Sequence, residues 1–345
     1  MAATIKDVAR EAGVSVATVS RVVNGLGNVT DETTRLVNEA AGRLGYIPHS
    51  GARSLSTRQT HCVGAVLPDL YGEFFSELIR GIDRVARLHG LHLLLSCSHG
   101  DAREVSAALR AMQGRVDGLL VMSPHVDAGV LEENLPSSMP TVLMNTPHGG
   151  ERLSSILVDN YGGACAMVRH LHGRGHRRIA MIAGPEANHD ARERLRGCLD
   201  TLDELSPGTP PQVLRGDFTE ESGYRAGRQL LAMVERPDAV FAANDVMAVG
   251  CLFALNEGGF AVPADIALAG FDDIPIARYV TPPLTTVRIQ IAELGELALE
   301  RLLLAIEQKG QDKASRQMLR SELVVRSSCA RRAAARVVGV TKPRR

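Results

Sequence analysis

Residues 3–25, ATIKDVAREAGVSVATVSRVVNG, decide how the first sixty residues fold. Apolar side chains at positions 5, 8, 9 and 12 form one face of a short helix, for which Thr4 is a suitable N-cap. Gly13 can take the left-handed conformation that ends a helix, and Ser15 can cap the next one. A second helix over 16–24 would pack inward through its valines. Two short helices joined by a glycine turn predict a helix-turn-helix.

A third helix is expected to complete this head. It would run from about Asp31 to Leu44, with Thr30 as its N-cap and Gly45 as its stop. Three such helices could form a simple packing unit with no further role. The exposed residues of the second helix favour DNA binding instead, because they suit contacts in a major groove.

The expected major-groove residues lie at the start and on the outer face of the second helix: Val16, Ala17, Thr18 and Arg21. Arg21 suits a bidentate contact to guanine, and Val16 or Ala17 suits a thymine methyl group. Polar groups that suit the phosphate backbone stand on Lys6, Ser20 and Asn24, and the Thr18 hydroxyl is of the same kind.

The charge distribution agrees with a DNA-binding head. The 345 residues carry 39 Lys and Arg against 39 Asp and Glu, so the net charge is zero. Residues 1–60 carry +2, residues 61–325 carry −9 and residues 326–345 carry +7. Uneven charge of this kind indicates a polyanion partner for one end. We expect the basic tail, 331–345, to be disordered.

From residue 61 the pattern changes to alternating strands and helices. Short apolar strands are expected at 61–67, 91–96, 116–122, 141–144, 156, 178–183, 213–214, 239–243 and 266–270. Helices are expected at 74–88, 101–113, 161–173, 191–205, 221–235, 245–257 and 290–307. Near-continuous apolar strands between helices predict parallel sheets covered on both faces. The fold class is therefore α/β, with an all-α head and two doubly wound subdomains.

Ligands of such sheets bind beyond the carboxyl ends of the strands. The residues at these positions are 69–75, 96–99, 123–125, 145, 184–194, 217–218, 244–245 and 272–273. Carboxylate, amide and guanidinium groups around phenylalanine rings suit a polyhydroxylated small molecule. A polar loop rim without a ligand would contain many of the same residue types.

The quoted head sequence resembles the signature of the lactose/galactose repressor (LacI/GalR) family of bacterial transcription regulators. LGYIPHSGARSLST at 44–57 resembles that family's hinge, which forms a short helix on DNA. The resemblance implies that Ala52, Arg53 and Leu55 act at the minor groove, with Leu55 as the inserted wedge. Gly51 departs from the family pattern, because members more often carry a larger residue there.

The body resembles the family's effector domain, which is similar to periplasmic sugar-binding proteins. The motifs include VDNYGGA (158–164), ARERLRG (191–197), GDFTEESGYRAG (216–227), FAANDVMAVG (241–250) and GFDDI (270–274). The resemblance implies an effector site formed by Phe74, Phe75, Asn145, Asp190, Arg194, Phe218, Asn244 and Asp272. The run at 186–190 differs from that of the purine-binding branch, so we expect a sugar or sugar derivative.

The implied organisation is a headpiece at 1–48, a hinge at 49–60 and an effector-binding core at 61–330. The core would divide into two subdomains, one formed by 61–159 and 291–321 and the other by 160–288 and 322–330. The chain would cross between them near 158–162, 288–291 and 320–323. Since no long leucine heptad follows Arg326, we expect a homodimer on a pseudopalindromic operator. The resemblance places its interface at 74–88 and near Val249 and Tyr279.

The predicted function is a DNA-binding transcriptional regulator, expected to be a repressor, under allosteric control by a small effector. A cytosolic α/β enzyme acting on a sugar phosphate or nucleotide is the alternative. It would need a nucleophile motif or phosphate loop, and neither G-x-S-x-G nor G-x-x-x-x-G-K-[ST] occurs. We therefore expect no enzymatic activity and no metal or other cofactor. With charges near the N-terminus and no run of about 18 apolar residues, we expect a cytoplasmic protein and no membrane partner.

Overall fold

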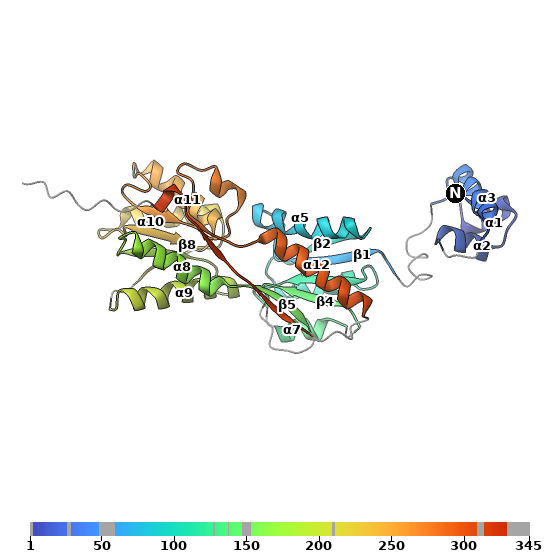
Figure 1. The fold of residues 1–345 in the computed structure, drawn as a ribbon, viewed down its shortest axis with the longest axis horizontal. Coiled ribbons are helices and arrows are strands. Elements are labelled where there is room, and N and C mark those ends of the chain that lie inside the picture. Colours follow the sequence, from blue (N-terminus) through green and yellow to red (C-terminus); the bar gives the residue numbers. More distant parts are fainter. Residues whose placement is uncertain are drawn as a thin grey trace, which may run out of the picture.

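The computed structural model describes residues 3–25, 29–47, 59–126, 128–136, 138–146, 153–208, 211–308 and 314–329. It forms a helical head and a two-lobed α/β body (Figure 1). The predicted fold class is confirmed. Within the described ranges, none of the helices is both long and apolar enough to cross a lipid bilayer.

The head contains α1 (Ile5–Ala12), α2 (Val16–Val23) and α3 (Asp31–Leu44). Each N-cap is the residue that the sequence indicates, at Thr4, Ser15 and Thr30. α1 and α3 end at glycines in the left-handed conformation, Gly13 at φ 67° and Gly45 at φ 59°. The three helices share a small core made of Val8, Ala9, Val19, Val37 and Ala40.

The first lobe is built on a six-stranded sheet in the order β11-β5-β4-β3-β1-β2, in which all neighbours are parallel. Its strands are β1 (Cys62–Leu67), β2 (His92–Cys97), β3 (Gly118–Met122), β4 (Thr141–Met144), β5 (Ser154–Val158) and β11 (Arg316–Leu319). Its helices are α5 (Glu73–Leu88), α6 (Ala102–Met112), α7 (Ala128–Asn134) and α12 (Ile291–Glu307).

Alternate residues of β1 show how both faces of this sheet are covered. Val63, Ala65 and Leu67 belong to the same core as residues of α5 and α12, whereas Val66 packs with residues of α6. This is the two-residue period of a strand buried on both sides. α5 and α12 approach so closely that a Cβ at Gly81 would lie 2.0 Å from the Ala292 carbonyl oxygen.

The second lobe has a four-stranded parallel sheet in the order β7-β6-β8-β9. The strands are β6 (Ile179–Ala183), β7 (Gln212–Arg215), β8 (Ala239–Ala242) and β9 (Ala267–Ala269). The helices are α8 (Asn160–Gly173), α9 (His189–Leu205), α10 (Glu220–Ala232) and α11 (Asp245–Glu257), followed by the 3₁₀ turn η1 (Pro275–Arg278).

The chain passes between the lobes three times. β5 leads to α8, the short strand β10 (Thr286–Arg288) leads to α12, and β11 leads to β12 (Glu322–Val324). β10 and β12 pair antiparallel beside the second lobe, and the 3₁₀ turn η2 (Ser327–Cys329) follows. The crossings lie at 158–160, 288–291 and 319–322. The sequence pattern did not predict α7, β10, β11 or β12, and α10 ends three residues earlier than expected.

Candidate effector site and DNA-binding face

A cavity of about 190 Å³ lies between the two lobes, at the carboxyl ends of their strands. The first lobe supplies residues that follow β1 and β3 and residues at the start of α5. The second lobe supplies residues from α9, the β7–α10 loop, the start of α11 and the segment after β9. The lining residues are Pro68, Asp69, Tyr71, Gly72, Glu73, Phe74, Phe75, Met122, Pro124, Asn188, Asp190, Arg194, Asp217, Phe218, Thr219, Glu220, Asn244, Val246 and Asp272.

Arg194 of α9 is the centre of the polar wall and is only 4 % exposed. Its Nε donates to Asn160 Oδ1 at 2.7 Å, and its Nη1 donates to the Ala243 carbonyl at 2.6 Å. Nη2 lies 3.0 Å from Asp272 Oδ1 in a buried ion pair. The guanidinium carbon also lies 3.9 Å from the Phe271 ring centre. These contacts hold the planar guanidinium in one orientation.

Two buried carboxyl groups flank Arg194. Burial raises the pKa of Asp190 to about 7, although Arg194 acts in the opposite direction. Burial also raises the pKa of Asp272 to about 6, again against the effect of Arg194. Asp190 accepts a hydrogen bond from Asn160 Nδ2 at 2.9 Å. Asn160 therefore orients both Arg194 and Asp190.

Aromatic rings form the apolar part of the cavity. Phe74 and Phe75 meet edge to face, with ring centres 5.2 Å apart. Phe218 comes from the other lobe, and its φ of 70° is unusual for a non-glycine residue. A Cβ at Gly184 would lie 2.6 Å from the Phe218 ring, so the glycine allows this packing. Aromatic faces of this kind suit the C–H face of a sugar ring.

Asp272 and Asp273 have positive φ values of 109° and 56°, and Asp272 forms an isolated β-bridge with Arg288. Their side chains serve different sites, because Asp272 pairs with Arg194 and Asp273 with three other arginines. Such a pair is poorly arranged to share a proton in acid-base catalysis.

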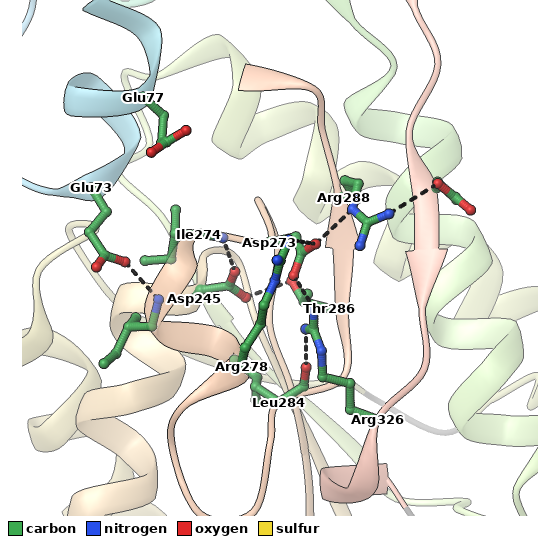
Figure 2. Close-up of polar contacts among 12 residues, drawn as sticks. Glu73, Glu77, Asp245, Asp273, Ile274, Arg278, Leu284, Thr286, Arg288 and Arg326 are labelled. Carbon is green, nitrogen blue, oxygen red and sulfur yellow. Dashed lines mark hydrogen bonds and ion pairs between the residues drawn. The ribbon is translucent and has the colours of Figure 1, made fainter. Parts of the chain in front are cut away.

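Figure 2 shows the group around Asp273, whose side chain is 1 % exposed. Its Oδ2 lies 2.7 Å from Arg288 Nε and 3.7 Å from Arg278 Nη2, and its Oδ1 pairs with Arg326 Nη2. Arg288 ends β10 at one interlobe crossing, and Arg326 follows β12. Ion pairs of Asp273 thus join the segment that carries Asp272 to residues near two of the three crossings.

Polar contacts also join the lobes at the edges of the cavity. Glu73 of α5 accepts a hydrogen bond from the Ile276 amide at 2.8 Å (Figure 2). The His189 amide donates to the Pro124 carbonyl at 3.0 Å, and Asn188 and His125 make a contact of 3.4 Å. A change in the separation of the lobes would break or strengthen these contacts.

The site residues predicted from the sequence lie in different environments. Seven of the eight line the cavity, namely Phe74, Phe75, Asp190, Arg194, Phe218, Asn244 and Asp272. Asn145 is 1 % exposed and lies outside the described cavity lining, and a hydrogen bond from its side chain acts to lower the pKa of Asp190. The sequence interpretation missed Asn160. It belongs to the quoted motif VDNYGGA, but its contact with Arg194 spans 34 residues of the chain.

The head presents most of the predicted DNA-contacting residues on α2. Val16, Ala17 and Arg21 are exposed on α2, and Lys6 is exposed on α1. The Thr18 hydroxyl contacts Ser15 Oγ at 2.8 Å, and Asn24 Nδ2 donates to Ser20 Oγ at 3.3 Å. The predicted minor-groove residues Ala52, Arg53 and Leu55 lie outside the described residues, so they stay a prediction.

Comparisons with known proteins agree on both parts of the chain. Residues 4–49 match the family model described as bacterial regulatory proteins, lacI family, and residues 168–329 match that of a periplasmic binding protein-like domain. The ribose operon repressor of Escherichia coli K12 is 41 % identical over 313 residues, covering 89 % of this chain and 94 % of that protein. The transcriptional repressor CytR of the same organism is 36 % identical, covering 95 % and 96 %.

Solved structures give the same result. A crystal structure of the Lac repressor dimer bound to operator and the anti-inducer ONPF has a TM-score of 0.85 and 31 % identity, covering 96 % of this chain and 100 % of that chain. A regulator from Enterococcus faecium, solved with bound ribose, has a TM-score of 0.70 and 26 % identity, covering 78 % and 99 %.

Proposed function

This chain belongs to the lacI family of bacterial regulatory proteins, and from that premise we propose how its two parts work together. The protein is a DNA-binding transcriptional repressor that is controlled by a small effector. It binds a pseudopalindromic operator as a homodimer through α2 and the hinge segment. The effector is a sugar, bound between the lobes around Arg194, and it changes the operator affinity.

One observation carries this proposal: a single chain combines an exposed Arg21 on a capped α2 with an interlobe cavity built around Arg194. The α2 face suits base edges in a major groove. The cavity combines acidic and amide side chains with aromatic rings from both lobes. At about 190 Å³ it is smaller than the ~300–1,000 Å³ typical of drug-sized ligands, which favours a monosaccharide.

The coupling follows from the contacts around Asp272. A ligand held by Asp272 and Arg194 stabilises one conformation of the segment 272–273. Asp273 of this segment forms ion pairs with Arg288 and Arg326. Closure of the lobes then changes the spacing of the two headpieces in the dimer. A ligand shifts this equilibrium only by its difference in affinity for the two states.

D-ribose is the first effector to test, because the relatives include a ribose operon repressor and a ribose-bound regulator. An enzymatic role is not favoured, because the relatives are repressors and the two acids nearest Arg194 are engaged with Asn160 and Arg194.

The experiment that tests the DNA-binding function is selection from a pool of randomised duplexes with the full chain. The expected result is a pseudopalindromic site whose half-sites are about one helical turn, ~10 base pairs, apart from centre to centre. Recovery of no consensus sequence, or of a site without two-fold symmetry, would contradict the proposal.

A further inference from the structure

We infer that the interlobe cavity selects a ligand that is rich in hydroxyl donors and carries no phosphate or other anionic group. The inference rests on the proposed effector function of this cavity and specifies the chemistry of the effector. It depends on the charges that line the cavity, on the hydrogen bonds that its donors already make, and on the helix ends that face it.

The lining is strongly acidic. It contains six carboxyl side chains, on Asp69, Glu73, Asp190, Asp217, Glu220 and Asp272. Among the described lining residues, Arg194 is the one lysine or arginine. A phosphate dianion placed here would share the cavity with these six acidic groups, of which Asp190 and Asp272 add less negative charge near neutral pH because their pKa values are raised to about 7 and about 6. Like charges brought together in this way are strongly disfavoured.

Arg194 is not free to offset this repulsion. Each of its three guanidinium nitrogens already has a partner, Asn160, Ala243 or Asp272, so three of its five N–H donors are used. Turning the guanidinium toward a phosphate would leave the Ala243 carbonyl and the Asp272 carboxylate buried and without these partners. Leaving buried polar groups without partners is costly. Arg194 can therefore offer a ligand the two N–H groups that these contacts leave, while its charge is balanced by the paired Asp272.

The other side-chain donors of the wall are also engaged. Asn244 Nδ2 donates to the Phe218 carbonyl at 3.1 Å, and Thr219 Oγ1 donates to Asp217 at 2.5 Å. Tyr71, which is exposed, is a further lining residue with a hydroxyl group. The wall thus offers mainly acceptors, and hydroxyl groups of a ligand can donate to them. A fully ionised phosphate group has only acceptors.

Helix N-termini often bind phosphate through their free amide groups and the helix dipole. Four helices begin at or beside this cavity, and each carries an acidic residue in its first turn: Glu73 in α5, Asp190 in α9, Glu220 in α10 and Asp245 in α11. The carboxyl groups of Glu73, Asp190 and Glu220 line the cavity at their helix ends, whereas that of Asp245 is buried against Thr286 and the Ile274 amide. The usual route to phosphate binding is therefore opposed at three of these ends.

The test is isothermal titration calorimetry of the full chain with matched pairs of ligands. The pairs are D-ribose and D-ribose 5-phosphate, D-glucose and D-glucose 6-phosphate, and adenosine and adenosine 5′-monophosphate. We expect at least one neutral member to bind, and its phosphate ester to bind at least about 100-fold more weakly.

Asp190→Asn tests whether the carboxyl groups set this selectivity. The titrations are done at pH 8, above the raised pKa of Asp190, so the variant removes a negative charge while it keeps an acceptor for Asn160. Discrimination against the phosphate ester should then fall by about tenfold or more. Affinity for the neutral ligand should change less. Glu204→Gln on the same helix is the matched control, because Glu204 is exposed and pairs with Arg169 away from the lining. Thermal unfolding verifies that both variants are folded.

A phosphate ester that binds as tightly as its neutral partner, or more tightly, would overturn the inference. Equal discrimination by the wild-type chain and Asp190→Asn would overturn the role given to the carboxyl groups. Failure of all three neutral ligands to bind would also count against the inferred class. Because calorimetry is done without DNA, these outcomes are distinct from a failure of the duplex selection, which would contradict the proposed function.

Discussion

The substitution Asp273→Asn should destabilise the second lobe strongly. Asp273 is 1 % exposed, and its partners Arg326 and Arg288 have side chains that are 14 % and 30 % exposed. Removing one partner of a fully buried ion pair costs ~3–5 kcal/mol. Arg288 keeps Glu322 at 3.6 Å and Arg326 keeps the Leu284 carbonyl at 2.7 Å. We therefore expect a loss of roughly 2–4 kcal/mol, somewhat below the fully buried case.

Asparagine is chosen because it tolerates the left-handed conformation at position 273, where φ is 56°. The substitution therefore changes the charge with little change in backbone strain. Urea unfolding followed by far-UV circular dichroism is a suitable assay, because the chain has no tryptophan for fluorescence. The chain has more than one folding unit, so the transition that reports the second lobe should be fitted by itself.

Glu204→Gln is the control for this measurement. It removes the partner of Arg169 from a pair whose side chains are 59 % and 52 % exposed. Exposed ion pairs contribute little to stability, so no measurable change is expected. If Asp273→Asn were no more destabilising than Glu204→Gln, the structural role assigned to the Asp273 arginine group would be refuted.

The remaining predictions concern the cavity and the head. The pKa values of Asp190 and Asp272 are raised to about 7 and about 6 in the folded state, whereas an unfolded Asp has a pKa of ~3.9. From about pH 4 up to these raised values, the folded state therefore binds more protons than the unfolded state. Their contribution to the free energy of unfolding should therefore decrease as pH rises from 5 to 8, and urea titrations should show a smaller decrease for Asp190→Asn; an identical pH dependence would count against the assignment. Arg21→Ala should weaken operator binding by ~1–3 kcal/mol and relax specificity at one base pair per half-site, measured by fluorescence anisotropy, whereas a uniform loss on all sequences would indicate a phosphate contact. Ser15→Ala should lower the stability of the head by ~1 kcal/mol, since its side chain caps α2, and an unchanged melting curve of the head would contradict that role. Leu55→Ala should weaken specific binding far more than non-specific binding, and equal losses would argue against a minor-groove wedge.

The head could be predicted closely because its signals are local. Thr4, Ser15 and Thr30 cap the helices that directly follow them, and Gly13 and Gly45 end the helices that directly precede them. Each signal acts within one helical turn of the element that it defines. The valines that form the small core also follow from helical spacing alone.

In the body most helices and central strands were predictable, and four short elements were not. β10 and β12 have three residues each, too few to show a period. β11 is an edge strand with exposed residues, so it lacks the apolar run of a central strand. α7 is a single short helix of seven residues between two strands.

The cavity could be predicted in outline, because the carboxyl-end rule indicates which loops meet. The hydrogen bonds and ion pairs within the cavity wall could not be predicted. Asn160 contacts Asp190 and Arg194 across 30 and 34 residues of the chain, and no local pattern marks such contacts. The positive φ values at Asp272 and Asp273 could not be predicted either, because aspartate occurs in many backbone conformations.

The most direct test of the central claim is the operator affinity of the full chain with and without the sugar that binds the cavity. The operator is the duplex recovered by selection, and the sugar is the neutral ligand found by calorimetry. The account predicts that a saturating concentration of the sugar changes the dissociation constant for operator by ~5–150-fold, and that this change is lost in Asp272→Asn. A sugar that binds the cavity and leaves operator affinity unchanged would contradict it.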